Sequence, residues 1–228
     1  VITTQGEVVD LEFQDTPIHF SPCGGAEQDP DDWWNALVGT AKKLIQKKPV
    51  PVDRIIAISI SSTFSSTVAV DRNGHHLMNS LTWMDSRGAR YIKERFRGFP
   101  AVNGINLFKG LKWVAKTAGA PSPSGKDDIA HVLFIKHQYP EIYENTYMFL
   151  PSKDYLNLRL TGEFSASYDS MHLFWMTNCK DINNMYYYDS LLRTVGIDKE
   201  KLPPMKNSTD ILGKIKPSVA EEIGISPE

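Results

Sequence analysis

The chain has 228 residues, of which 41% are hydrophobic and 11% aromatic, so it can bury a sizeable core as one large domain or as a domain with a small satellite. Its 25 Lys and Arg residues nearly balance its 27 Asp and Glu residues, and a formal charge of -2 offers no basic surface for nucleic acid or an anionic membrane. No apolar run approaches the roughly 18 to 20 residues that cross a bilayer. We therefore expect a small-molecule ligand, no nucleic acid and no membrane.

The first half of the chain mixes hairpin and helix patterns. The run VITTQGEVVDLEFQ predicts a hairpin that turns at Gly6. Asp29 as N-cap, Pro30 at the first helical position and apolar residues at helical spacing predict a helix over about residues 30 to 47. The run DRIIAISIS is typical of a strand buried on both faces. TVAVD, the turn RNG and HHLMNSLTW then predict a second hairpin, which ends at Trp83.

The rest of the chain is mainly helical in pattern. Helices are predicted in SRGARYIKERF, NLFKGLKWVAKT, DIAHVLFIKHQY, PSKDYLNLRL, YYYDSLLRTVG and PSVAEEIG, several with a glycine at the C-terminal stop. The segment AGAPSPSGKDD is rich in Pro, Gly and Ser and is the best candidate for an exposed loop or insertion. These patterns together indicate an α/β domain with a mixed sheet and helices on its faces.

Several familiar catalytic motifs are missing from the sequence. It contains no GxxxxGK[ST] loop, no GxGxxG after a strand, no HExxH, no CxxC and no GxSxG. Cys23 and Cys179 lie far apart, which indicates no disulfide framework and favours a cytoplasmic setting. His75 and His76 are adjacent on a predicted strand and point to opposite faces, so a structural or solvent role is favoured over a shared metal.

Two features can form a binding site. The first is a hydroxyl-rich run after the isoleucine strand: Ser59, Ser61, Ser62, Thr63, Ser65, Ser66 and Thr67. Ligands of open α/β sheets bind beyond the carboxyl ends of the strands, where short polar side chains can reach them. The alternative is that small residues let a helix pack closely, and the pattern gives the two interpretations equal weight.

The second feature is the stretch TWMDSR, which contains Trp83, Asp85 and Arg87. On an extended segment these side chains project to one side at steps of about 6.6 Å. An indole face covers the apolar surface of a sugar, a carboxylate accepts from its hydroxyls and a guanidinium donates to them. Alternatively, Asp85 is the N-cap of a helix that begins at Ser86, and spacing alone favours this cap. Both roles can coexist.

Three stretches together resemble a known family. EQDPDDWW (27–34), ISISSTFSSTVAVDRNGHHLMNSLTWMDSR (58–87) and FLPSKDYLNLRLTGE (149–163) have the order and spacing typical of the N-terminal domain of the FGGY carbohydrate kinases. The resemblance implies a ribonuclease H-like domain of the actin/hexokinase type. It also implies ATP-dependent phosphorylation of a hydroxyl of a sugar, sugar acid or polyol, with ATP and Mg²⁺ as cofactors. As an enzyme, such a protein is a phosphotransferase with an alcohol group as acceptor.

The resemblance also assigns roles to residues. It places substrate contacts at Ser62, Thr63, Phe64, Trp83, Asp85 and Arg87. The EQDPDDWW motif is interpreted as helix capping and core packing, with no catalytic role. The family's phosphate loop is expected before Val1 and its catalytic Asp beyond Glu228, so no residue of this chain is assigned as catalytic or as a nucleotide ligand. The chain is expected to be one domain truncated at both ends, inactive alone, with residues 103–128 as an insertion or loop region.

The chain departs from the family pattern in two places. STFSS stands where many xylulose kinases have a Gln-Met-His-Gly type sequence, which argues against xylulose as the substrate. SMHLFW replaces a small Ala-Ser-Gly-Thr type segment. A non-catalytic kinase-like module that binds a ligand or regulates a partner is therefore the alternative function, and a homodimer is left open. Another ATPase of the actin superfamily is disfavoured because the matching stretches are those of sugar kinases.

Overall fold

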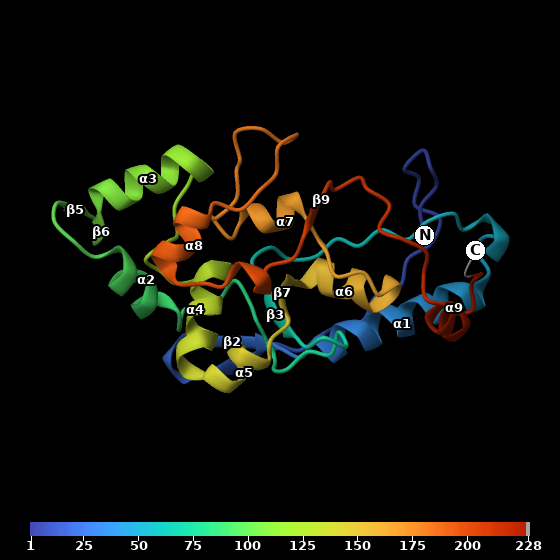
Figure 1. Ribbon diagram of the computed structural model, residues 1–228. Helices are drawn as coiled ribbons and strands as arrows, with labels where there is room; N and C mark the ends of the chain where they lie inside the picture. The colour runs from blue at the N-terminus through green and yellow to red at the C-terminus, as the bar shows by residue number, and fades with distance from the viewer. Residues whose placement is uncertain (227–228) are drawn as a thin grey trace.

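An antiparallel five-stranded sheet lies at the centre of the structure, a computed structural model that describes residues 1–226 (Figure 1). The strands run in the order β1 (His19–Ser21), β2 (Gly25–Gln28), β4 (Ser80–Leu81), β3 (Thr67–Val70) and β7 (Met148–Pro151). The pairing of β3 with β7 sets Val68 opposite Leu150 and Ala69 opposite Phe149. Two short pairs stand apart: antiparallel β5 (Ala101–Val102) with β6 (Ile105–Asn106), and parallel β8 (Ala166–Ser167) with β9 (Met205–Lys206).

Helices cover both faces of the sheet, because apolar side chains of the strands point to both faces. Val68, Val70 and Leu150 pack with α1 (Pro30–Lys47), α6 (Ser152–Thr161) and α9 (Pro217–Ile223). Ala69 and Phe149 pack in a second core formed by α2 (Ala89–Phe96), α3 (Leu107–Thr117), α4 (Asp128–Gln138), α5 (Pro140–Asn145), α7 (Tyr168–His172) and α8 (Asp189–Val195). A fully buried apolar side chain in such a core contributes roughly 1.5–3 kcal/mol. The result is the expected α/β architecture, a sheet flanked by helices, although the five-stranded sheet is antiparallel where a mixed sheet was predicted.

The predicted helix boundaries agree with the structure where capping signals are strong. α1 covers Pro30–Lys47, and Oδ1 of its N-cap Asp29 accepts the backbone N–H of Asp31 at 2.9 Å. Gly162 ends α6 with φ +88°, a conformation that costs glycine little because it lacks a Cβ. Within the described residues, no helix is both long and apolar enough to cross a membrane. Cys23 and Cys179 carry free thiols.

The predicted isoleucine strand is wrong in this structure. Val52–Arg54 forms a 3-10 turn, and the residues that follow it up to Phe64 belong to no strand. Ile56 is 79% exposed and Ile58 46% exposed, although both are expected to be buried in such a strand. The physical reason is that no strand of residues 1–226 forms a ladder beside this segment, so its backbone groups and apolar side chains face outward.

The predicted first hairpin and the predicted loop are only partly present. Ile2 and Val8 form an isolated antiparallel bridge across the turn at Gly6, without a longer ladder. In the region 103–128, β6 and α3 are regular, and only about residues 118–127 form the loop. That loop packs closely against the start of α2, because a Cβ at Gly125 would lie 2.1 Å from the backbone nitrogen of Ala89.

Candidate functional site

Two predicted segments meet where the interior strands β3 and β4 of the central sheet begin and end. The loop that contains Ser62, Thr63 and Phe64 leads into β3, and the turn that contains Trp83 follows its neighbour β4. The rings of Phe64 and Trp83 stack, with centroids 6.0 Å apart and planes 25° from parallel. Phe64 is 62% exposed and Trp83 40% exposed, so the pair presents an aromatic surface to solvent. Exposed aromatic faces of this kind bind the apolar faces of ligands that also carry polar groups.

The hydroxyls beside this aromatic surface are held by short contacts. Ser152 Oγ at the start of α6 donates to Ser62 Oγ at 2.9 Å, and Ser62 Oγ donates to the carbonyl of Thr63 at 3.2 Å. Thr63 Oγ1 lies 3.2 Å from Ser66 Oγ. Ser62 and Thr63 are nevertheless exposed, so their hydroxyls can also reach a ligand. Within the hydroxyl-rich run, Ser62 and Thr63 are thus accessible, whereas Ser65, Ser66 and Thr67 are buried.

Trp83, Asp85 and Arg87 do not form the single extended row that their spacing predicted. The backbone N–H of Asp85 donates to the carbonyl of Thr82 at 2.8 Å, which closes a turn. The turn separates the side chains, because Trp83 stays half-exposed while Asp85 has no exposed surface. The predicted helix cap is also wrong, since α2 begins at Ala89 with Gly88 as its N-cap.

Asp85 instead organises the backbone and the arginine around it. Its Oδ2 accepts the N–H of Ala26 at 3.0 Å, and its Oδ1 accepts the backbone N–H of Arg87 at 3.0 Å. The Arg87 guanidinium donates to Asp85 Oδ2 through Nε at 2.9 Å and through Nη2 at 2.6 Å. Nη2 also reaches Glu27 Oε1 at 2.5 Å. The carboxylate of Asp85 is therefore fully engaged inside the protein, and it acts on the site by fixing Arg87.

Arg87 lies between this acidic pair and the core. Its guanidinium carbon is 4.5 Å from the centroid of the Phe134 ring on α4, and its side chain is 14% exposed. Burial alone would lower the pKa of Arg87, but hydrogen bonds to Asp85 and Glu27 outweigh burial and hold that pKa above its ordinary value. The arginine is thus a permanent cation held by two carboxylates.

A buried polar network lies beneath the site, and the sequence did not predict it. The Thr67 hydroxyl on β3 donates to Asp128 Oδ1 at 2.9 Å and lies 3.1 Å from His131 Nδ1. Burial raises the pKa of Asp128 to about 7, against hydrogen bonds from Thr67 and Ser65. Burial lowers the pKa of His131 to about 4, against the charge of Asp85. The only sequence signal was two polar residues at an i, i+3 spacing in the first half of a helix whose next four residues are apolar.

The loop before α4 brings a further cation to the aromatic pair. Ser65 Oγ donates to the carbonyl of Lys126 at 3.0 Å, which ties the loop to the hydroxyl-rich run. Lys126 Nζ lies 6.0 Å from the centroid of the Trp83 ring. Asp127 Oδ1 accepts from Trp175 Nε1 at 3.1 Å and anchors the other side of the loop. Lys126 is therefore a candidate rim residue, although its sequence context indicates only a loop.

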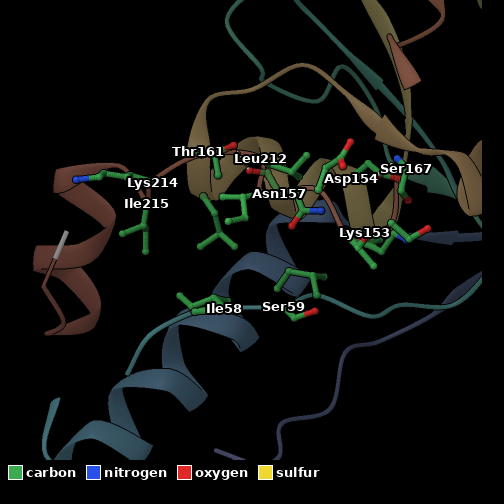
Figure 2. Close-up of a pocket in the computed structure, with 18 of the residues that line it drawn as sticks. Ile58, Ser59, Lys153, Asp154, Asn157, Thr161, Ser167, Leu212, Lys214 and Ile215 are labelled. Carbon is green, nitrogen blue, oxygen red and sulfur yellow. Dashed lines mark hydrogen bonds between the residues drawn. The ribbon is translucent and has the colours of Figure 1, made fainter. Parts of the chain in front are cut away.

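A cavity lies elsewhere, along the segment that was expected to be a strand. Its volume is about 640 Å³, and its walls come from residues 55–60, from α6 and from residues 207–215 (Figure 2). Lys153 and Asp154 face it from α6, and burial raises the pKa of Asp154 to about 6. None of the six predicted site residues lines this cavity. One wall of the cavity is an extended backbone segment with exposed isoleucines.

Comparisons with known proteins identify relatives of the chain. Residues 1–228 match the FGGY family of carbohydrate kinases, N-terminal domain. The chain is 26% identical to a gluconokinase from Bacillus subtilis, over 100% of this chain and 41% of that protein. It resembles the crystal structure of a xylulose kinase from Rhodospirillum rubrum, with a TM-score of 0.82 and 19% identity over 99% of this chain and 44% of the other.

A third match is the crystal structure of a glycerol kinase from Plasmodium falciparum with ADP. Its TM-score is 0.76, with 17% identity over 93% of this chain and 41% of the other. Likeness at such low identity establishes the shared fold. In each of the three cases the chain spans less than half the length of its relative.

Proposed function

The chain belongs to the FGGY family of carbohydrate kinases, and we propose that it forms the sugar-binding side of an ATP-dependent enzyme that phosphorylates a hydroxyl of a sugar, sugar acid or polyol. The observation that carries this proposal is the exposed stack of Phe64 on Trp83 beside the hydroxyls of Ser62 and Thr63. A polyhydroxylated ligand needs both features, because its C–H face packs on an aromatic ring while its hydroxyls exchange hydrogen bonds with short polar side chains.

The charged residues have distinct roles in this proposal. In this proposal Arg87, which follows the turn that carries Trp83, and Lys126, which lies beside the Trp83 ring, act as hydrogen-bond donors to a ligand hydroxyl or carboxylate. Asp85 is a positioning residue, because each of its oxygens already accepts from the protein. We expect Asp85→Asn to weaken substrate affinity through a misplaced Arg87, while nucleotide affinity stays nearly unchanged.

ATP and Mg²⁺ belong to the proposed reaction but not to the residues of this site. The sequence carries no phosphate-binding loop of the types named above. Phosphoryl transfer needs a cradle for the nucleotide phosphates, a metal and a carboxylate that accepts the substrate proton. We propose that other parts of a longer protein supply these groups, consistent with a chain that covers 41% of the Bacillus gluconokinase. Residues 1–228 alone are then expected to bind substrate without turnover.

The names of the relatives indicate a polyhydroxylated compound as the substrate. Those names cover gluconate, xylulose and glycerol kinases. The exposed phenyl ring of Phe64 within STFSS favours a ligand with a broad apolar face over a small triol, because a larger face covers more of the ring. We therefore place a sugar or sugar acid ahead of glycerol.

The aromatic pair offers a direct test with a matched control. In the full-length protein, Trp83→Ala or Phe64→Ala should raise KM for the sugar about tenfold with little change in kcat, since a lost ring contact worth about 1.4 kcal/mol is a factor of ten. Phe108→Ala is the control, because Phe108 on α3 is 66% exposed, close to the 62% of Phe64, and lies outside the site. Equal KM values in all three variants would show that the aromatic surface is not part of the binding site.

The alternative function, a kinase-like module that binds a ligand without catalysis, rests on the departure of STFSS from the family pattern. Direct calorimetric titration separates the two functions when it is combined with an assay for ADP. Both functions predict sugar binding that Trp83→Ala weakens, but only the kinase releases ADP when sugar, ATP and magnesium are present together.

A further inference from the structure

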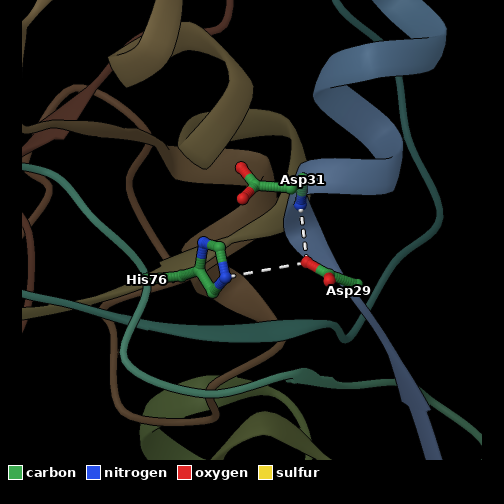
Figure 3. Close-up of side chains that lie close together, drawn as sticks. All are labelled: Asp29, Asp31 and His76. Carbon is green, nitrogen blue, oxygen red and sulfur yellow. Dashed lines mark hydrogen bonds and ion pairs between the residues drawn. The ribbon is translucent and has the colours of Figure 1, made fainter.

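Three side chains that take no part in the proposed sugar site converge at the start of α1. Asp29 and Asp31 belong to the N-terminal turn of that helix, and His76 belongs to the segment that pairs back onto β3 after the turn at residues 71–74 (Figure 3). One ligand atom from each residue lies within 4.8 Å of the other two. His76 Nε2 is 3.6 Å from Asp29 Oδ1. Parts of the chain about 45 residues apart thus bring one nitrogen and two carboxylates together.

A contact on the side of the ring away from the carboxylates fixes the orientation of His76. Its Nδ1 lies 3.2 Å from the hydroxyl of Tyr155, whose ring meets the imidazole edge-on at 6.2 Å and 82°. Nε2 is consequently the nitrogen that faces the carboxylates. Metal-binding histidines usually have such a partner on the second nitrogen, because it holds the ring and sets the tautomer. His75 differs, since its side chain is 77% exposed and faces Asp71.

Both carboxylates keep coordinating capacity. Asp29 Oδ1 accepts the helix-capping N–H of Asp31, and Asp31 Oδ1 accepts Arg159 Nη1 at 2.9 Å. The second oxygen of each carboxylate accepts no hydrogen bond from residues 1–226. Arg159 compensates one of the two negative charges, which leaves one negative charge facing the His76 ring. A cation at this point would be attracted by that remaining charge.

The surroundings leave room for solvent ligands. A cavity of about 380 Å³ borders Asp31, His76 and Arg159. A set of one imidazole nitrogen and two carboxylate oxygens, completed by water, suits Zn²⁺ better than Mg²⁺ or Ca²⁺, which prefer oxygen alone.

We propose that Asp29, Asp31 and His76 bind a Zn²⁺ ion that braces the start of α1 against the hairpin that follows β3. Nε2 of His76 and one oxygen from each carboxylate are the protein ligands. The ion has a structural role, since it adds a link between two segments that are joined next to the site by the pairing of β2 with β4 and by the long contact between His76 and Asp29.

The alternative to a bound metal ion is a direct ion pair between a protonated His76 and Asp29. Titration with Zn²⁺ by calorimetry, and with Co²⁺ by its visible absorption, distinguishes the two. All proteins carry Cys23→Ser and no affinity tag, because the exposed Cys23 thiol also binds soft metals. We expect saturable binding of one ion per chain and a Co²⁺ spectrum without sulfur charge-transfer bands.

Matched variants decide the assignment. His76→Ala should weaken Zn²⁺ binding at least tenfold, whereas His75→Ala, one residue away and with its side chain toward Asp71, should leave it unchanged. Asp31→Asn gives an independent readout should His76→Ala fold poorly, and it should also weaken binding at least tenfold. The proposal is overturned if no saturable binding occurs, or if either His76→Ala or Asp31→Asn binds as tightly as the parent.

Discussion

Replacing Asp85 by alanine tests the organisation of the site most severely, because it removes the hydrogen-bond acceptor of four donor groups at once. The carboxylate accepts from the N–H groups of Ala26 and Arg87, and from Nε and Nη2 of the Arg87 guanidinium. Asp85 has no exposed surface and Arg87 is 14% exposed, so water cannot readily replace the lost partners. Only Glu27 would remain paired with the arginine.

Breaking a buried ion pair from one side costs about 3–5 kcal/mol, because the other charge stays buried without its partner. We expect about 3 kcal/mol for Asp85→Ala, the low end of the range, since Glu27 still holds one guanidinium nitrogen. The measurement is urea unfolding followed by circular dichroism, with Asp189→Ala as control. Asp189 forms an exposed pair with Lys199, and its loss should leave the midpoint at the parent value. A loss below about 1 kcal/mol in Asp85→Ala would refute the buried pair.

Three further predictions concern other parts of the fold. Burial raises the pKa of Asp128 from an ordinary 3.8 to about 7, so folding favours the protonated acid. The stability that protonated Asp128 contributes is present below about pH 4 and is lost as pH rises through 7. Asp128→Asn does not titrate, and its unfolding free energy relative to the parent should therefore rise from pH 4 to pH 8, by at most about 4 kcal/mol; a constant difference would contradict the buried acid. A Cβ at Gly88 would lie 2.4 Å from the carbonyl oxygen of Ala130, so Gly88→Ala should lower thermal stability by about 1–3 kcal/mol, and an unchanged midpoint would mean that α2 and α4 are not in close contact. Ile56 is 79% exposed on an extended segment without a ladder partner in residues 1–226. Ile56→Lys should therefore reduce self-association of the chain in analytical ultracentrifugation, and equal association would contradict the idea that this segment pairs with another copy.

Local signals predicted the helices well and the strands less well. A capping acid, a following proline and apolar spacing placed α1 at Pro30–Lys47, and glycine stops placed the ends of α6, α8 and α9. A strand needs a partner that local sequence does not specify. The run at residues 55–60 has the composition of a buried strand but forms no ladder in the described residues, so it stays irregular.

The site shows the same division between local and long-range information. The sequence brought Ser62, Thr63, Phe64 and Trp83 into one hypothesis, and the structure places Phe64 on Trp83. It could not predict that Asp85 is buried, because its partner Ala26 is 59 residues away in sequence. Asp128 and His131 were missed for a similar reason. Both side chains interact with the hydroxyl of Thr67, which is 61 residues from Asp128 and 64 from His131 in sequence.

The central claim is that these 228 residues provide the sugar-binding side of a carbohydrate kinase. The most direct test measures ADP release by the full-length protein with ATP, magnesium and a panel of pentuloses, hexuloses, sugar acids and polyols. The account predicts that at least one sugar or sugar acid stimulates ADP release well above the rate with ATP alone, and that residues 1–228 by themselves release none. Stimulation by no member of the panel, or turnover by the isolated chain at the full-length rate, would contradict it.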